Sequence, residues 1–166
     1  MAQSVAWGRR SSLQRSVLHS KERRIIVDGL LNLALFVRIF LVGFVLNLMW
    51  EFAHCHLYET CRRQSWAQNA PLLVTMALKD GGFIVLFYAV SVAVVQSVDI
   101  TRHALALLYF AALSLGFAFV SETVSLRMKR WEYTTTMPRV LGVGITPLLE
   151  IALTGLLTLV IVFRLL

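Results

Sequence analysis

Five polar and aromatic residues in the first third of the chain have the spacing of one helix face. They stand at positions i, i+3, i+4, i+7 and i+11, namely Asn47, Trp50, Glu51, His54 and Tyr58. A carboxyl group surrounded by apolar side chains can hold a proton at neutral pH, so Glu51 is suited to act as a general acid on an apolar substrate. His54, one turn further on, could relay that proton. The stripe therefore predicts a site on this face.

Four carboxyl groups lie inside long apolar runs, where charge is expensive: Glu51, Asp80, Glu122 and Glu150. A lone charge in the middle of a membrane costs roughly 3 kcal/mol, so four would cost on the order of 10 kcal/mol unless they are paired, buried or functional. All four fall toward the same side of the membrane, so we expect them to line one cleft. The predicted catalytic residues are Glu51, Asp80, Glu122 and His54. The predicted substrate-binding residues are Asn47, Trp50, Tyr58, Trp131, Tyr133 and Glu150.

Two other interpretations of the stripe remain open. Glu51 and His54 have the Glu-x-x-His spacing of metal sites in helix bundles, but such sites need a second motif, and the chain has none. We therefore predict no metal and no cofactor; haem is disfavoured because His54 and His103 belong near opposite membrane faces. The structural alternative is that Asn47, Glu51 and His54 only hydrogen-bond to neighbouring helices, while Lys79 pairs with one of the acids.

Long apolar runs carry these residues and define the fold class. The chain of 166 residues is 58% apolar and only 15% charged, with a mean hydropathy of +0.72. Its runs reach the ~20 residues that a helix needs to cross a membrane. We predict an all-α integral membrane four-helix bundle over residues 35–166, with spans at 35–57, 71–98, 104–126 and 140–163, after a basic, partly interfacial arm over 1–34. Pro71 should open the second span, and Thr146 and Pro147 should kink the fourth and free the carbonyl of Val143.

The net charge of +7 does not indicate a nucleic-acid partner, because most basic residues stand at the ends of apolar runs, where they anchor a membrane protein. The expected partners are membrane lipid and a small hydrophobic ligand, with no nucleic acid and a possible homo-oligomer. Both termini are placed in the cytoplasm, since the basic arm precedes the first span.

The two cysteines, Cys55 and Cys61, match no metal or redox spacing. A disulfide between them would require the first helix to end before Cys61. We expect two free thiols.

The motif Asn47-x-x-Trp50-Glu51 resembles a signature of the small multi-pass membrane terpene cyclases of meroterpenoid pathways. In that family an intramembrane acid protonates a polyprenyl epoxide, which implies that Glu51 is a site acid and that the substrate is an isoprenoid. The match covers about a dozen residues, and those cyclases have more helices, so it assigns no second acid here. The residues Arg130-Trp131-x-Tyr133, Met137-Pro138 and Pro147-Leu148-Leu149 resemble small bacterial multi-pass membrane proteins.

The function that these patterns favour is an enzyme that uses carboxyl groups as general acid and base on a small hydrophobic, possibly isoprenoid, substrate, as a cyclase does. One alternative is a proton-coupled transporter or channel subunit that works as an oligomer. Another is a membrane assembly or anchoring subunit. The chain has no Ser-His-Asp set, phosphate loop, CxxC motif or dinucleotide fingerprint, which removes several common enzyme classes.

Overall fold

The computed structural model describes residues 32–166, and it confirms the all-α class. Four helices are long and apolar enough to cross a membrane: the first helix Asn32–Leu57, α3 Trp66–Val95, α4 Ala104–Arg127 and α5 Ile145–Arg164. A short helix, α2 (Glu59–Arg63), and a 3-10 turn, η2 (Ile100–Arg102), lie in the connections. Residues 38–166 form one compact unit. The predicted arm lies outside the described residues as far as residue 31, and residues 32–34 are already helical.

The second span begins ahead of the residue expected to open it. Its start is Trp66, because Ser65 caps the helix and its backbone N–H donates to the Gln68 side chain at 3.0 Å. Pro71 consequently lies inside α3. The helix ends at Val95, where Gln96 turns into the left-handed region with φ of 55°.

The fourth span begins later than expected and has no proline kink. Residues 139–144 instead form a small antiparallel hairpin, β1 (Arg139–Val140) and β2 (Val143–Gly144), which turns at Leu141 and Gly142 with positive φ at both. Pro147 therefore falls in the first turn of α5, where a missing N–H leaves no bond unmade. The expected release of the Val143 carbonyl by a kink was wrong for this reason.

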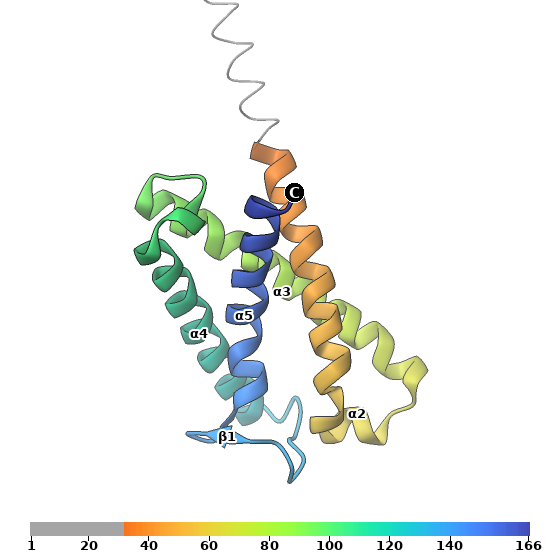
Figure 1. Cartoon of the computed structure of the whole chain (residues 1–166). Helices are drawn as coiled ribbons and strands as arrows, with labels where there is room; N and C mark the ends of the chain where they lie inside the picture. The colour runs from red at the N-terminus through yellow and green to blue at the C-terminus, as the bar shows by residue number, and fades with distance from the viewer. Residues whose placement is uncertain (1–31) are drawn as a thin grey trace, which may run out of the picture. The chain divides into compact units, whose positions relative to one another are not determined.

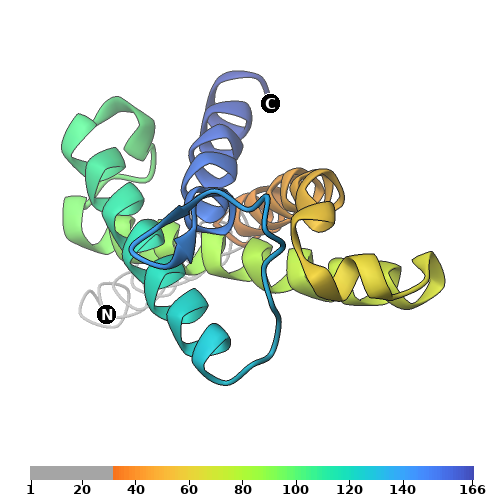
Figure 2. The same cartoon turned by 90° about the horizontal axis from the view of Figure 1, so that it is seen from below.

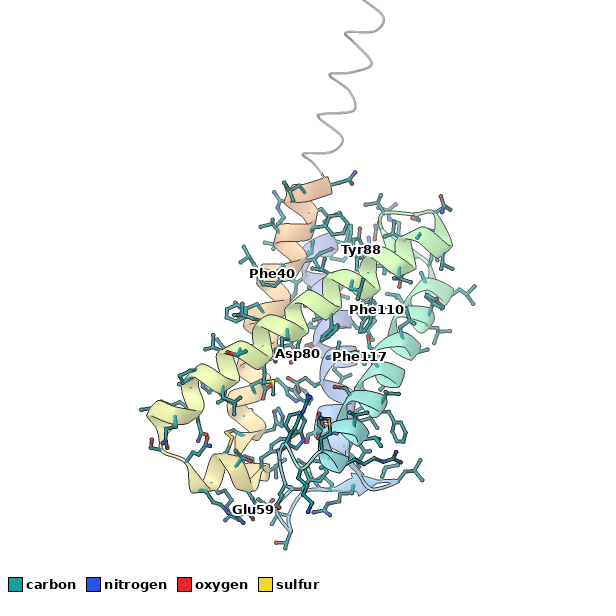
Figure 3. All side chains as sticks on the ribbon, turned by 180° about the vertical axis from the view of Figure 1, so that it is seen from behind. Phe40, Glu59, Asp80, Tyr88, Phe110 and Phe117 are labelled. Carbon is teal, nitrogen blue, oxygen red and sulfur yellow. A yellow bond between two sulfur atoms is a disulfide. The ribbon has the colours of Figure 1, made fainter. Side chains whose placement is uncertain are left out.

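The helices pack tightly in the half of the unit that contains the α3–α4 connection and the C-terminus (Figure 1). Ile84, Phe110 and Leu159 have no exposed surface there. A Cβ at Gly81 would lie 3.2 Å from the backbone nitrogen of Phe44, so α3 and the first helix approach each other through their backbones. α3 runs obliquely across the other helices (Figure 3), which separates its N-terminal half from α4.

At the opposite end, the loop between α4 and α5 crosses the bundle and pairs with the end of the first helix (Figure 2). Tyr58 and Tyr133 form an isolated antiparallel bridge. Two backbone hydrogen bonds flank it, from Glu59 N to Glu132 O at 2.9 Å and from Thr134 N to Leu57 O at 2.9 Å. This pairing fixes the loop over the end of the bundle.

The two cysteines are joined in a disulfide, contrary to the expected free thiols. The first helix tightens into a 3-10 turn at Cys55–Leu57, and Tyr58 is extended, so the chain reverses before Cys61. This reversal brings the two Cα atoms to 5.7 Å.

Candidate functional site

One cavity of about 520 Å³ lies between the first helix, α3, α4 and α5. It is on the side of the bundle covered by the loop of residues 128–138 between α4 and β1, called the aromatic loop below. Its volume is in the range of small-molecule sites. Much of the wall is apolar, including Leu72, Leu73, Met76, Phe83 and Phe117. Figure 3 labels Asp80 on α3 and Phe117 on α4, which line the cavity from facing helices. The polar lining comprises Glu51, His54, Tyr58, Thr60, Lys79, Asp80, Ser121, Ser125, Arg130, Trp131 and Glu150.

Three carboxyl groups from three helices meet at one wall of this cavity. Glu51 comes from the first helix, Asp80 from α3 and Glu150 from α5, and each contributes one oxygen to a group in which all lie within 4.8 Å of one another. The side chains of Glu51 and Glu150 are only 12% and 8% exposed. The predicted convergence of these acids is therefore present in the structure.

His54 faces the same group from within the first helix. Its Nδ1 lies 2.6 Å from the carbonyl oxygen of Trp50, and because a carbonyl can only accept, Nδ1 carries the proton. Its Nε2 lies 3.9 Å from Glu51 and 3.8 Å from Glu150, which is too far for a hydrogen bond to either. In the neutral ring, the Nε2 lone pair therefore points at the carboxyl groups.

No lysine or arginine in residues 32–166 forms an ion pair with Glu51, Asp80 or Glu150. Lys79 lines the cavity and its charge acts on Asp80, so the expected pairing is present as an attraction without a direct ion pair. Oε1 of Glu150 is buried without any hydrogen-bond partner. Glu51, Asp80, Glu150 and His54 can together carry more negative than positive charge, and Oε1 of Glu150 lacks a hydrogen bond.

Glu122, predicted to work with the other acids, is not among the residues that line the cavity or in the group of three close carboxyl groups. Its Oε1 accepts hydrogen bonds from the Tyr58 hydroxyl at 3.4 Å, Trp131 Nε1 at 3.0 Å and the Tyr133 hydroxyl at 2.5 Å. The Tyr133 oxygen also accepts from Gly144 N at 2.9 Å. Glu122 therefore holds the aromatic loop against the first helix.

The two tyrosines keep their protons in this arrangement. Burial, followed by the nearby Glu122 carboxylate, raises the pKa of Tyr58 well above its ordinary value. Burial and the hydrogen bond to Glu122 likewise raise the pKa of Tyr133. Both hydroxyls remain donors at any physiological pH, so the loop stays attached.

Two residues of the predicted stripe, Asn47 and Trp50, are not among those that line the cavity. Asn47 is fully buried; its amide nitrogen donates to the Gly43 carbonyl at 2.7 Å, and its amide oxygen lies 2.9 Å from Thr154 Oγ1. Trp50 contributes its carbonyl to His54, while its own Nε1 is buried without a partner. Tyr58 and Trp131 line the cavity.

Several lining residues were not singled out from the sequence, among them Ser121, Ser125 and Arg130. Ser121 and Ser125 stand one turn apart on α4 and share a helix face with Ala118. This face of small residues was the sequence signal that could have indicated a cavity lining. Arg130 follows the end of α4 and was noted within the Arg130-Trp131-x-Tyr133 motif, which assigned it no role in the site.

Residues 32–166 thus form an all-α protein with four helices that can span a membrane, and Glu51, Asp80, Glu150 and His54 form an acid–histidine group at its cavity. A scan of protein-family models, a search of curated proteins and a search of solved structures each found no match to the chain.

Proposed function

We propose that the protein is a multi-pass membrane enzyme that transfers protons to and from a small hydrophobic substrate in the cavity. The observation that carries the proposal is the meeting of Glu51, Asp80 and Glu150 with His54 at the wall of a largely apolar cavity. Carboxyl groups within 4.8 Å of one another compete for protons, which favours a protonated member beside an ionised one. Such a pair supplies an acid and a base to one substrate.

His54 fits the role of relay between two of these acids. Its Nε2 stands 3.9 Å from Glu51 and 3.8 Å from Glu150, so a small movement of either carboxyl group toward the ring makes a hydrogen bond. The Trp50 carbonyl keeps Nδ1 protonated, which leaves Nε2 as the atom that gains or loses the proton.

The walls support an apolar substrate. Phe83 and Phe117, with ring centroids 4.1 Å apart, present aromatic surface beside the acids, and Trp131 lies at the loop side. Ring faces of this kind stabilise a developing cation. An isoprenoid substrate and a cyclisation follow from the resemblance of Asn47-x-x-Trp50-Glu51 to the terpene cyclases, and we retain both as part of the proposal.

The packing favours an enzyme over the proton-coupled transporter or channel. Beyond Glu150, α5 continues with Thr154 and Thr158, but each hydroxyl donates to the backbone carbonyl one turn back at 2.7 Å. Gly155 and Phe110 are in close contact at the same level. These contacts fill the bundle beyond Glu150, whereas a transporter needs a second exit for its substrate.

The disulfide supports the orientation with both termini in the cytoplasm. Disulfides persist in oxidising compartments and are rare in the cytosol. The Cys55–Cys61 disulfide lies at the C-terminal end of the first helix, beside the cavity. This end of the bundle would therefore face away from the cytoplasm. A membrane-impermeant thiol reagent, applied to intact cells after mild reduction, should label the chain, which has no other cysteine. Labelling that requires permeabilised cells would reverse the orientation.

The test of the enzyme proposal compares the lipids of cells that express the wild type, Glu51→Gln or Glu132→Gln, with cells that express none. Glu132 is a matched control, because it is 66% exposed and lies outside the cavity. We expect a hydrophobic species to be consumed or formed with the wild type and the control, and to be unchanged with Glu51→Gln when the variants are equally abundant. Full turnover in Glu51→Gln would overturn the proposal, and so would identical lipid profiles in all four samples.

A further inference from the structure

The acid–histidine group has the composition of a metal centre as well as of a proton-transfer site. Carboxylate oxygens and an imidazole nitrogen together suit divalent first-row ions such as Mn²⁺, Fe²⁺ and Zn²⁺. Glu51, Asp80 and Glu150 each offer one oxygen, and His54 offers Nε2. We propose that these four side chains bind one divalent transition-metal ion.

The distances fit an ion placed between the four side chains. Metal–oxygen and metal–nitrogen bonds are about 2.1 Å long, so ligand atoms around one ion lie roughly 3.4 Å apart at tetrahedral angles and about 4.2 Å apart when opposite. Nε2 of His54 lies 3.9 Å and 3.8 Å from the oxygens of Glu51 and Glu150. The carboxylate oxygens lie within 4.8 Å of one another. The three oxygens are close enough for one ion; for His54 to join them, Nε2 and the Asp80 oxygen, which are not within 4.8 Å of each other, must move closer together.

His54 is oriented as metal-binding histidines are. Such histidines donate their second ring N–H to a carboxylate or a backbone carbonyl, which fixes the tautomer and aims the free nitrogen at the ion. Nδ1 of His54 makes this bond to the Trp50 carbonyl at 2.6 Å. Its side chain is 7% exposed, and Nε2 lies 3.9 Å and 3.8 Å from the carboxylates of Glu51 and Glu150. The Trp50 carbonyl fixes the orientation of the His54 ring, so this observation does not depend on the positions of the three acids.

Glu150 supplies a second independent observation. Its side chain is 8% exposed, it lines the cavity, and its Oε1 has no hydrogen-bond partner. Buried polar atoms in folded proteins are almost always satisfied. A bound ion, directly or through its water, would satisfy this atom.

The charge of the site points in the same direction. Three carboxylates share one wall, and within residues 32–166 no lysine or arginine pairs with them. A buried charge that lacks a partner is strongly destabilising, and a divalent ion compensates two negative charges at once. Glu51 and His54 come from the first helix, and Asp80 and Glu150 come from α3 and α5. Because these two helices supply the other ligands, the site needs no second Glu-x-x-His motif.

The inference rests on the proposed function only for the location of the substrate, because the group lines the same cavity. An ion with octahedral coordination, such as Mn²⁺, held there by four protein ligands would keep positions open to the cavity. A water or a substrate oxygen bound at such a position would be polarised, and it would supply the acid or base of the reaction.

The experiment uses the full chain in mild detergent without an affinity tag. It is stripped with a chelator, incubated in turn with Mn²⁺, Fe²⁺ under anaerobic conditions, and Zn²⁺, and freed of excess ion. Metal content per chain and thermal melting are then measured. The variants are Glu150→Gln and His54→Gln, each close in size to the native residue, and the control is Glu132→Gln.

We expect the wild type and the control to retain one ion per chain and to melt several degrees higher with it. Both site variants should retain at least tenfold less ion and show no shift on melting. Absence of a retained ion and of a melting shift with all three metals in the wild type would overturn the metal site. Full retention in both variants would overturn the ligand assignment.

The two proposals fail separately. If the wild type retains no ion, the lipid comparison of Glu51→Gln still tests the enzyme proposal. A wild type that holds one ion but leaves every cellular lipid unchanged would keep the metal site and remove the enzyme.

Discussion

His54 Nε2 lies 3.8 Å from a carboxylate oxygen of Glu150, although His54 lies near the end of the first helix and Glu150 in the second turn of α5. The same imidazole is fixed at its other nitrogen by the Trp50 carbonyl at 2.6 Å. A ring held in this way has little freedom, so its free nitrogen stays directed at the carboxyl groups. The site is preorganised by backbone geometry, which both a proton relay and a metal ligand require.

Tyr133 should be important for the stability of the loop that covers the cavity. Its hydroxyl donates to Glu122 and accepts from Gly144 N, so Tyr133→Phe removes two hydrogen bonds and leaves a buried carboxylate with fewer donors. Bonds to charged groups contribute roughly 1.5–3 kcal/mol each. We expect the melting temperature in detergent to fall by several degrees.

The matched control is Tyr109→Phe, which removes a hydroxyl from a tyrosine that is 38% exposed and has no recorded hydrogen bond. Equal melting temperatures for the two variants would contradict the role of Tyr133.

Gly155 should not accept a side chain, because α4 and α5 touch there. A Cβ at this position would lie 2.6 Å from Cζ of Phe110, a ring with no exposed surface and no room to move. Overpacking of this kind costs about 1–3 kcal/mol, so Gly155→Ala should melt several degrees lower than the wild type.

Gly82→Ala is the control for this change, since no atom lies within 4 Å of a Cβ there. Alanine is favoured over glycine in a helix by about 1 kcal/mol, so the control should melt no lower than the wild type. A stabilising Gly155→Ala would mean that the helices do not pack as described.

The fold class was predictable because membrane-spanning helices leave a strong one-dimensional signal. A run of apolar residues must satisfy its backbone internally, so Ala104–Arg127 could be recognised by length and composition. Local capping chemistry was harder to recognise. Ser65 and Gln68 start α3 inside a polar stretch, where the apolar pattern gives no helix start. Pro147 lies in the first turn of α5, but in the sequence it stands within an apolar run, where a proline suggests a kink.

The site was predictable in part, for a related reason. The cost of burying acids singled out Glu51, Asp80 and Glu150, and spacing placed His54 beside Glu51. Which acids meet depends on the crossing angles of helices, which no spacing along one helix encodes. Glu122 has the same apolar surroundings in sequence, yet it faces the aromatic loop.

The Cys55–Cys61 disulfide should stabilise the turn that ends the first helix. Closing so short a loop is worth roughly 2 kcal/mol in the chain-entropy account. Reductant should therefore lower the melting temperature of the wild type by a few degrees. A double variant with Cys55→Ser and Cys61→Ser should melt at that lower temperature with or without reductant. A wild type that is indifferent to reductant, with two thiols that react before reduction, would contradict the disulfide.

Asp99 should make stability depend on pH at the end of the bundle remote from the cavity. Partial burial raises the pKa of its carboxyl, but hydrogen bonds from Thr101 and Arg102 and the charge of Arg164 outweigh this and hold the pKa below its usual value. A carboxyl whose pKa is lowered on folding stabilises the protein above its unfolded-state pKa, about 3.9, and this contribution is lost as the pH falls through the folded-state pKa.

Asp99→Asn should therefore melt lower than the wild type at pH 7, by the equivalent of about 0.5–1 kcal/mol, since the carboxyl is partly exposed and solvent weakens its ion pairs. The difference should shrink steadily below pH 4, where the wild-type carboxyl also becomes neutral. Melting curves from pH 3 to 7 measure this, with Glu132→Gln as the exposed carboxyl control. A difference between Asp99→Asn and the wild type that stays constant over the whole range would show that the hydrogen bonds of Asp99 stabilise the turn without its charge.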